Sequence, residues 1–229
     1  AGEGLANEGV NSTKLGLNGI PDLAEHIQIA RDLFLLEYTG GKLHIPTIST
    51  AKSVALIKEA KKKGLNVTCS VSAHHLTLTD DELATFDANS KVTTPRRTKK
   101  DCKSLIKGRK DGSIDMITSG DNPIDIEHKK VEFSAAKNGT IGLESLFGAV
   151  NSVLSLEDSI SCLTTKPRER FNIKQAAIKE GEIADLTFFN PNTSYTFDTK
   201  NILSTSKNSA FIGKELDRKS TRLNSSHTS

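Results

Sequence analysis

The sequence predicts an α/β protein with parallel strands, to which a small β element is joined. Between residues 21 and 120, short β-branched runs alternate with longer segments whose apolar residues recur every three or four positions. Such alternation is typical of βαβ units, whose strands run parallel. After residue 180 the pattern changes to two strand-like runs joined by a turn. We therefore expect an α/β body and a β appendage.

The first 20 residues are rich in glycine, and we interpret them as a loop. Pro21 then begins a helical segment that ends at the glycine pair 40–41. Its apolar residues recur at helical spacing, namely Leu23, Ile27, Ala30, Phe34 and Leu35.

Two strands and the helix between them are expected next. Residues 42–49 predict a short strand, which Pro46 ends early or bends. The Ser-Thr pair at 49–50 is suited to cap the following helix, which Gly64 ends. Its inward face consists of aliphatic residues, namely Val54, Ile57 and Ala60. Residues 66–72 are rich in β-branched side chains and predict the next strand.

The second half of the chain begins with a helical turn at 80–86 and a helix near 99–108. Residues 111–120 then predict a third buried strand. Its core is expected to be Ile114, Met116 and Ile117.

Two helices and two strands complete the expected order of elements. Residues 141–154 and 156–171 predict the helices, the second interrupted at Pro167 because proline cannot donate a backbone hydrogen bond. Residues 180–198 predict two strands joined by an Asn-Pro-Asn turn.

Both ends of the chain look artificial. It begins with Ala1, which indicates an internal fragment of a longer protein. Residues 217–229, DRKSTRLNSSHTS, have no apolar periodicity and look like the in-frame translation of a sequencing-library adapter. We leave this segment out of the predicted fold and expect that deleting it leaves folding and solubility unchanged.

Composition and charge exclude several function classes. The formal net charge of +3 includes three cations and one anion from the last thirteen residues, so no clustered basic face points to nucleic acid. No apolar run approaches the roughly 20 residues that span a bilayer, which excludes a transmembrane segment. The three cysteines form no CxxC pair, which favours a reducing, cytoplasmic compartment.

Several blocks of the sequence together resemble the dihydroorotases of the amidohydrolase superfamily. These blocks are HIPTISTAKSVALIKEAKKKGLNVTCSVSAHHLTLTDDEL, KVTTPRRTKKD, DGSIDMITSGDNP, HKKVEFSAAKNGTIGLES and GEIADLTFFNP. They follow the family's order and spacing over residues 7–216. The resemblance implies the C-terminal part of a TIM-type (β/α)8 barrel over residues 1–171 and a β-sandwich segment over 172–216.

The resemblance also implies a chemistry and partners. Dihydroorotases of pyrimidine biosynthesis close N-carbamoyl-aspartate reversibly to dihydroorotate, using zinc to activate a hydroxide and an aspartate to move the proton. Non-catalytic relatives assemble with aspartate carbamoyltransferase, which is therefore the expected partner, together with further copies of the chain itself.

Four positions depart from the family's motifs. Thr47 in HIPTIST stands where the family has a zinc-binding histidine, and a hydroxyl cannot replace an imidazole there. Gly120 replaces the proton-shuttling aspartate, Ile124 a substrate-binding histidine, and Thr93 a substrate-binding asparagine. We therefore expect no retained catalytic, substrate or metal residue at these positions and no cofactor for this chain.

Four polar side chains are weaker candidates. His44 occupies a non-ligand position, where we expect it to be hydrogen-bonded internally. Adjacent residues of a strand point to opposite faces, so His74 and His75 are expected to be structural rather than to share a zinc ion. Asp121 lies one residue out of register and is expected to point away unless the loop bulges.

Three functions follow from this pattern. The favoured hypothesis is a catalytically defective scaffold of the dihydroorotase family. The second is an active dihydroorotase with a rebuilt site that uses Asp121, His74 or His75. The third is a hydantoinase- or allantoinase-like hydrolase, for which a zinc-binding histidine at position 47 would again be expected. An intact His-x-His motif upstream would favour the two enzyme hypotheses.

Overall fold

Three parallel strands form the centre of the protein. The computed structural model describes residues 4–175, 177–182, 184–190, 192–217 and 220–225. Strands β3 (Leu43–Ile45), β4 (Val67–Ser72) and β5 (Met116–Thr118) form a sheet in the order β3-β4-β5. Both pairings are parallel, which confirms the expected βαβ arrangement. The protein therefore has a mixed α/β architecture.

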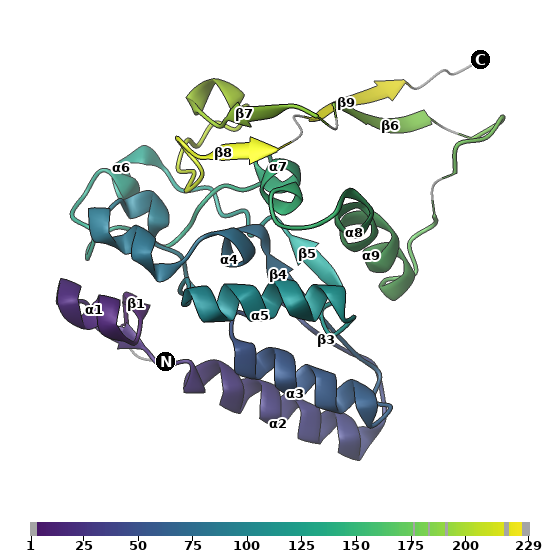
Figure 1. Cartoon of the computed structure of the whole chain (residues 1–229), viewed down its shortest axis with the longest axis horizontal. Helices are drawn as coiled ribbons and strands as arrows, with labels where there is room; N and C mark the ends of the chain where they lie inside the picture. The colour runs from purple at the N-terminus through teal and green to yellow at the C-terminus, as the bar shows by residue number, and fades with distance from the viewer. Residues whose placement is uncertain (1–3, 176, 183, 191, 218–219, 226–229) are drawn as a thin grey trace.

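Helix α2 (Leu23–Thr39) precedes β3, whereas α3 (Ala51–Lys62) lies between β3 and β4, and α5 (Lys99–Lys110) between β4 and β5. Helix α3 packs between the other two (Figure 1). The Thr50 side chain accepts a hydrogen bond from the Ser53 amide, which confirms the predicted cap of α3. The expected inward face of α3 is buried in the main core.

Short elements surround this body. Residues of the expected N-terminal loop form β1 (Ala6–Asn7), α1 (Val10–Leu15) and β2 (Gly19–Ile20), so the loop interpretation is wrong. Glycine is frequent in loops, but it also ends helices, and here Gly16, at φ 66°, ends α1. The other short elements are α4 (Ala73–Thr77), η1 (Asp80–Thr85), η2 (Ala88–Ser90) and α6 (Ile126–Lys129).

The two helices expected after residue 140 are shorter or less regular than predicted. Only α7 (Leu146–Asn151) forms within the first, because the backbone of residues 142–143 bonds a side chain instead. The second comprises α8 (Leu156–Ile160), the π-helical turn η3 (Ser161–Thr165) and α9 (Lys166–Arg170). Pro167 lies in the first turn of α9, where its missing N–H is tolerated, and the irregularity precedes it.

The C-terminal strands form, but they do not pair as a hairpin. Strand β6 (Ala184–Phe189) pairs antiparallel with β9 (Ser220–Ser225), and β7 (Ser194–Thr196) pairs with β8 (Glu215–Asp217), after the turn η4 (Thr199–Asn201). The expectation that residues 217–229 take no part in the fold is therefore wrong for β9, because backbone pairing needs no apolar stripe.

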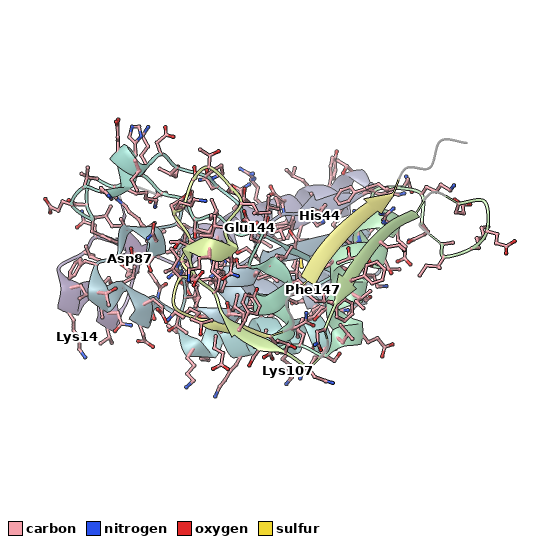
Figure 2. All side chains as sticks on the ribbon, turned by 90° about the horizontal axis from the view of Figure 1, so that it is seen from above. Lys14, His44, Asp87, Lys107, Glu144 and Phe147 are labelled. Carbon is pink, nitrogen blue, oxygen red and sulfur yellow. The ribbon has the colours of Figure 1, made fainter. Side chains whose placement is uncertain are left out.

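An aromatic pair links strand β6 to helix α7. Phe147 of α7, labelled in Figure 2, packs against Phe189 of β6 with ring centroids 5.0 Å apart. No helix within the described ranges is long and apolar enough to cross a membrane. The domain limits at residues 171 and 216 stay predictions.

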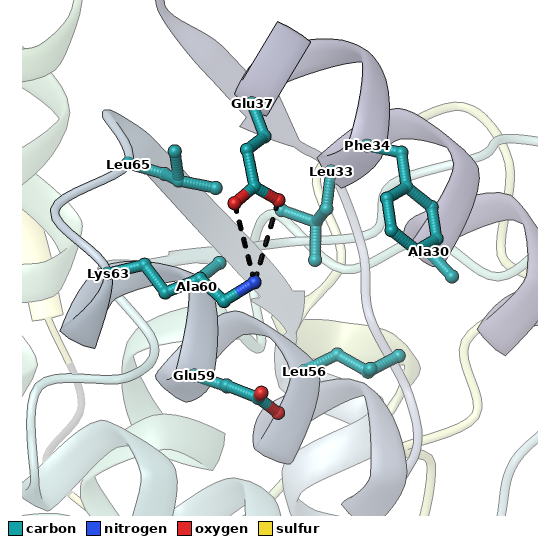
Figure 3. A pocket seen from close by; sticks show the side chains of 9 residues that line it. All are labelled: Ala30, Leu33, Phe34, Glu37, Leu56, Glu59, Ala60, Lys63 and Leu65. Atoms are coloured by element: carbon teal, nitrogen blue, oxygen red, sulfur yellow. Dashed lines mark hydrogen bonds and ion pairs between the residues drawn. The ribbon is translucent and has the colours of Figure 1, made fainter.

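Helix α2 buries a different face from the one its spacing indicated. Most of the predicted apolar residues are exposed, with Ile27 at 61% and Phe34 at 71%. The core instead takes Ile29, Leu33 and Leu36. The helix thus has two apolar stripes, and only the stripe that faces α3 finds a partner within the described part of the chain. A groove of about 140 Å³ lies beside this contact, where Lys63 is paired with Glu37 at 3.5 Å (Figure 3).

Candidate functional site

A small cavity lies beyond the carboxyl ends of the three parallel strands. It has a volume of about 130 Å³. Its lining comes from segments far apart in the sequence: Thr47, His74, His75, Val92, Thr93, Thr94, Gly120, Asn122, Gly139 and Thr140. Thr47 follows β3, the histidine pair follows β4, and Gly120 follows β5. Active sites of parallel α/β folds form at this end of the strands, because the loops there converge.

The backbone of Thr47 is strained. Its φ of 54° lies in the left-handed region, which a β-branched residue rarely adopts. The Thr47 amide donates to the Ser70 hydroxyl at 3.2 Å, which holds the turn after β3. Strain of this kind is concentrated at functional sites, so it supports the assignment of the cavity as the candidate site.

The two histidines share one hydroxyl group. Ser72 Oγ lies 3.1 Å from His74 Nε2 and 2.5 Å from His75 Nδ1. His75 Nε2 lies 3.0 Å from the Thr94 carbonyl, which only accepts, so this nitrogen carries the proton. The Ser72 hydroxyl therefore donates to His75 Nδ1 and accepts from His74 Nε2. His74 Nδ1 is left as an unprotonated acceptor, and no atom in the described ranges bonds it.

The expected opposite orientation of the histidine pair is wrong. Both residues belong to the helical turn α4 rather than to a strand, and their ring centroids are 4.4 Å apart. Burial lowers the pKa of His75 to about 4 and that of His74 well below its usual range. Both imidazoles are therefore neutral at neutral pH.

The ring of His74 occupies the space beside Gly120. A Cβ atom on Gly120 would lie 2.5 Å from His74 Cε1 and 2.9 Å from Ser72 Cβ, which are distances that real Cβ atoms do not show. The φ of Gly120 is 65°. A side chain at position 120 would therefore clash with its neighbours.

Two sequence candidates lie outside the cavity lining. The Asp121 carboxylate accepts hydrogen bonds from the amides of Gly142 at 2.8 Å and Leu143 at 3.3 Å, so it holds the following loop. Ile124 lines a second cavity of about 370 Å³ beside Lys129. The structure therefore brings together positions 47, 74, 75, 93 and 120, and it leaves positions 121 and 124 apart.

His44 lies elsewhere. Its Nδ1 is hydrogen-bonded to Thr68 Oγ1 at 2.9 Å, and its ring meets that of Phe171 edge-on. Burial, with the nearby Arg170, lowers its pKa. The contacts are those of a structural histidine.

Sequence reasoning missed a buried cation two residues beyond Thr94 in the chain. Arg96 is 2% exposed, and no described residue accepts a hydrogen bond from its guanidinium. Burial lowers its pKa to about 10, so it stays charged at neutral pH. Two carboxylates act electrostatically on Arg96, and both have other partners. Glu82 pairs with Lys214 at 2.7 Å, and Asp87 caps η2. The sequence around Arg96 carries no signal of whether the fold gives its guanidinium a partner.

The adjacent arginine is fully partnered. Arg97 donates to Asn7 Oδ1 at 2.8 Å and to Ser49 Oγ at 3.1 Å, and it lies 3.8 Å from Glu25. Glu25 in turn accepts from the Ser49 amide at 2.8 Å and from Ser53 Oγ at 2.5 Å. This network joins α2 to the N-terminus of α3.

Comparison with known proteins places this geometry in a family. No family model matches the chain. The dihydroorotase of Endomicrobium trichonymphae is 42% identical over 219 residues, which are 93% of this chain and 52% of that protein. This chain is a dihydroorotase homologue. A second dihydroorotase, from Trichlorobacter lovleyi, is 40% identical over 217 residues, 93% of this chain and 51% of that protein. The homologue described here thus spans about half the length of the curated relatives it matches.

Solved structures agree on the fold. L-hydantoinase from Arthrobacter aurescens matches with a TM-score of 0.77 and 26% identity over 85% of this chain and 46% of that one. The inactive dihydroorotase-like domain of a Chaetomium thermophilum CAD-like multifunctional protein matches with a TM-score of 0.62 and 20% identity, covering 83% of this chain and 51% of that chain. The second likeness concerns the fold alone.

The residues around the cavity of this dihydroorotase homologue do not fit zinc. Catalytic zinc sites use three protein ligands, drawn from histidine, cysteine and carboxylates. Both nitrogens of His75 are engaged, so the lining offers one free nitrogen, His74 Nδ1, and no carboxylate. Within the described part of the chain, no three such residues are grouped for a metal ion.

We expect the purified protein, incubated with zinc and desalted, to retain well under one zinc per chain. One free imidazole nitrogen cannot hold the ion against washing. Elemental analysis by mass spectrometry measures the ratio, and the Thr47→His variant tests whether one added imidazole suffices. Stoichiometric zinc that is lost on His74→Ala substitution would contradict the expectation.

Proposed function

We propose that this chain belongs to a catalytically defective dihydroorotase-family protein of pyrimidine biosynthesis, which serves as a scaffold. In this proposal residues 1–171 supply the last strands of a TIM-type barrel and residues 172–216 a segment of a β-sandwich. The partner that the resemblance implies is aspartate carbamoyltransferase, assembled with several copies of the scaffold. The homology to dihydroorotases and the α/β fold support this assignment.

The closed space beside Gly120 is the observation that carries the proposal. A general acid or base must come within hydrogen-bond reach of the proton that it moves. Position 120 has no side chain, and the His74 ring fills the volume that one would need. Asp121 cannot take over from its present position, because two backbone amides bind its carboxylate.

The histidine pair does not provide a substitute. Burial keeps both imidazoles neutral, and the Ser72 hydroxyl and Thr94 carbonyl engage three of their four nitrogens. The remaining lining side chains are hydroxyls, one amide and one aliphatic group, none of which titrates near neutral pH.

We expect the purified protein to show no dihydroorotate hydrolysis above background. Loss of a general acid or base costs about 10²- to 10⁴-fold in rate, and loss of the metal-generated hydroxide costs more. The assay follows the absorbance change on ring opening with zinc supplied, and a catalytically competent dihydroorotase measured in parallel is the positive control.

A joint variant tests whether the missing side chains account for the loss. It combines Thr47→His, Thr93→Asn, Gly120→Asp and Ile124→His, and any activity it gains must exceed that of Gly120→Asp alone. Robust turnover by the unmodified protein would refute the proposal and would point to Asp121 as a displaced proton shuttle.

A further inference from the structure

Helix α2 carries an apolar stripe on the side that does not face the core. Its members recur every three or four residues and therefore lie on one side of the helix, namely Leu23, Ile27, Ala30, Phe34 and Tyr38. The four large side chains among them are between 56% and 89% exposed. Helix α2 lies at the edge of the body, where it packs against α3 (Figure 1). A contiguous exposed apolar patch of this kind marks an interaction surface.

The charged side chains that flank this stripe are paired within the chain. Arg31 lies 2.8 Å from the Asp32 carboxylate, and Glu37 lies 3.5 Å from Lys63 (Figure 3). The face of a helix that meets only water is normally polar and charged. The exposed stripe of α2 instead presents aliphatic and aromatic groups, and the two flanking charges are already compensated. An apolar partner can therefore cover the stripe without leaving either charge unpaired.

The large residues of the stripe are spaced symmetrically. Positions 23, 27, 34 and 38 are mirrored about the point between residues 30 and 31, with aliphatic residues on one side and aromatic residues on the other. If two α2 helices paired antiparallel, Ile27 of each copy would lie opposite Phe34 of the other, and Leu23 opposite Tyr38. The small Ala30 at the centre would let the helices approach closely. Such self-complementarity is what a two-fold contact between identical chains requires, and an unrelated partner does not require it.

We propose that two copies of this chain pair through the exposed stripes of α2, antiparallel about a two-fold axis beside Ala30. With Leu35, which is exposed beside the stripe, the large side chains would bury about 600 Å² per copy. The total of about 1,200 Å² lies at the lower end of the range for specific interfaces. The inference rests on the proposed function, which assembles several copies of the scaffold, and it names the surface through which they meet.

Sedimentation equilibrium of the purified full chain tests the proposal. We expect a reversible equilibrium between the single chain of 24.8 kDa and a species of twice that mass, with a dissociation constant in the micromolar range. A single-chain mass at all concentrations up to about 100 µM would overturn the proposal and would leave the stripe to a different protein segment. Open-ended aggregation would overturn it too, because a two-fold contact closes on itself.

Exposed-site variants locate the interface. Phe34→Glu should weaken dimerisation at least about a hundredfold, because the two-fold axis places two new charges in one apolar contact. Ile178→Glu is the matched control, because Ile178 is 92% exposed and lies outside α2, and its dissociation constant should not change. Tyr38→Glu repeats the test if circular dichroism shows that Phe34→Glu does not fold. Unchanged dimerisation of the α2 variants would overturn the assignment of the stripe.

Paired substitutions test the antiparallel register. Adding Ile27→Lys to Phe34→Glu places opposite charges across from each other in the two copies and should restore dimerisation at least about tenfold. Adding Tyr38→Lys instead supplies the same charge one turn along the same helix, and it should restore no more than about threefold. Equal recovery by both would overturn the register.

Failure of this inference and failure of the proposed function give different results. Hydrolysis of dihydroorotate by the unmodified protein would refute the proposed function at any measured mass. A single-chain mass would refute the pairing of α2 whether or not the protein is active.

Discussion

Replacing Gly120 with aspartate should destabilise the fold by about 2–4 kcal/mol and should not produce a hydrolase. The new Cβ would approach His74 Cε1 to 2.5 Å and Ser72 Cβ to 2.9 Å, so the ring or the strand end must move. Moving the ring breaks its hydrogen bond to Ser72, which also orients His75. Aspartate tolerates the left-handed conformation better than most residues, so the clash is the larger contribution.

Urea denaturation followed by circular dichroism measures this loss. The double variant His74→Ala with Gly120→Asp removes the obstructing ring and should recover at least half of the stability lost by Gly120→Asp relative to His74→Ala alone. Such recovery would identify the clash as the cause. Unchanged stability of Gly120→Asp, or measurable dihydroorotate hydrolysis by it, would show that position 120 is open.

Replacing Glu25 with alanine should cost about 3–5 kcal/mol of unfolding free energy, because Arg97 would then be buried without its carboxylate. The side chain of Arg97 is 3% exposed, so water cannot take the place of the lost charge. Four donors would also lose this acceptor, namely the Ser49 amide and the hydroxyls of Ser49, Thr50 and Ser53.

Two further variants separate charge from shape. Glu25→Gln keeps the side-chain volume and one carbonyl acceptor, so it should cost less than Glu25→Ala. In an Arg97→Leu background the Glu25→Ala change should cost at least about 1 kcal/mol less, because no buried charge is then left alone. Equal costs in the two backgrounds, again measured by urea denaturation, would contradict the coupling between Glu25 and Arg97.

Local pattern was sufficient for the body of the fold. Pro46 ends β3, Thr50 caps α3 and Gly64 follows α3, so punctuation residues and spacing locate the βαβ units. Partners distant in sequence could not be inferred in this way. The pairing of β6 with β9 depends on which edges are free after the chain has folded, and the buried stripe of α2 depends on where α3 lies.

The candidate site, too, has a part that the sequence predicts and a part that it does not. The motif positions Thr47, Thr93 and Gly120 were located from sequence, and they meet at one cavity. The roles of Ser72 and Arg96 were not foreseen, because each is defined by its neighbours in space. The orientation of the histidine pair was misjudged because one helical turn, α4, is too short to show a period.

The hydrogen-bonded series from His74 through Ser72 and His75 to the Thr94 carbonyl has one direction. A carbonyl oxygen has no proton to return, so it sets the tautomer of His75, and that ring sets the hydroxyl and then His74. Reversing the series would leave two acceptors facing each other at Thr94. His74 is therefore the acceptor end of this series: the one nitrogen that the series leaves over, Nδ1, carries no proton to give to a neighbour.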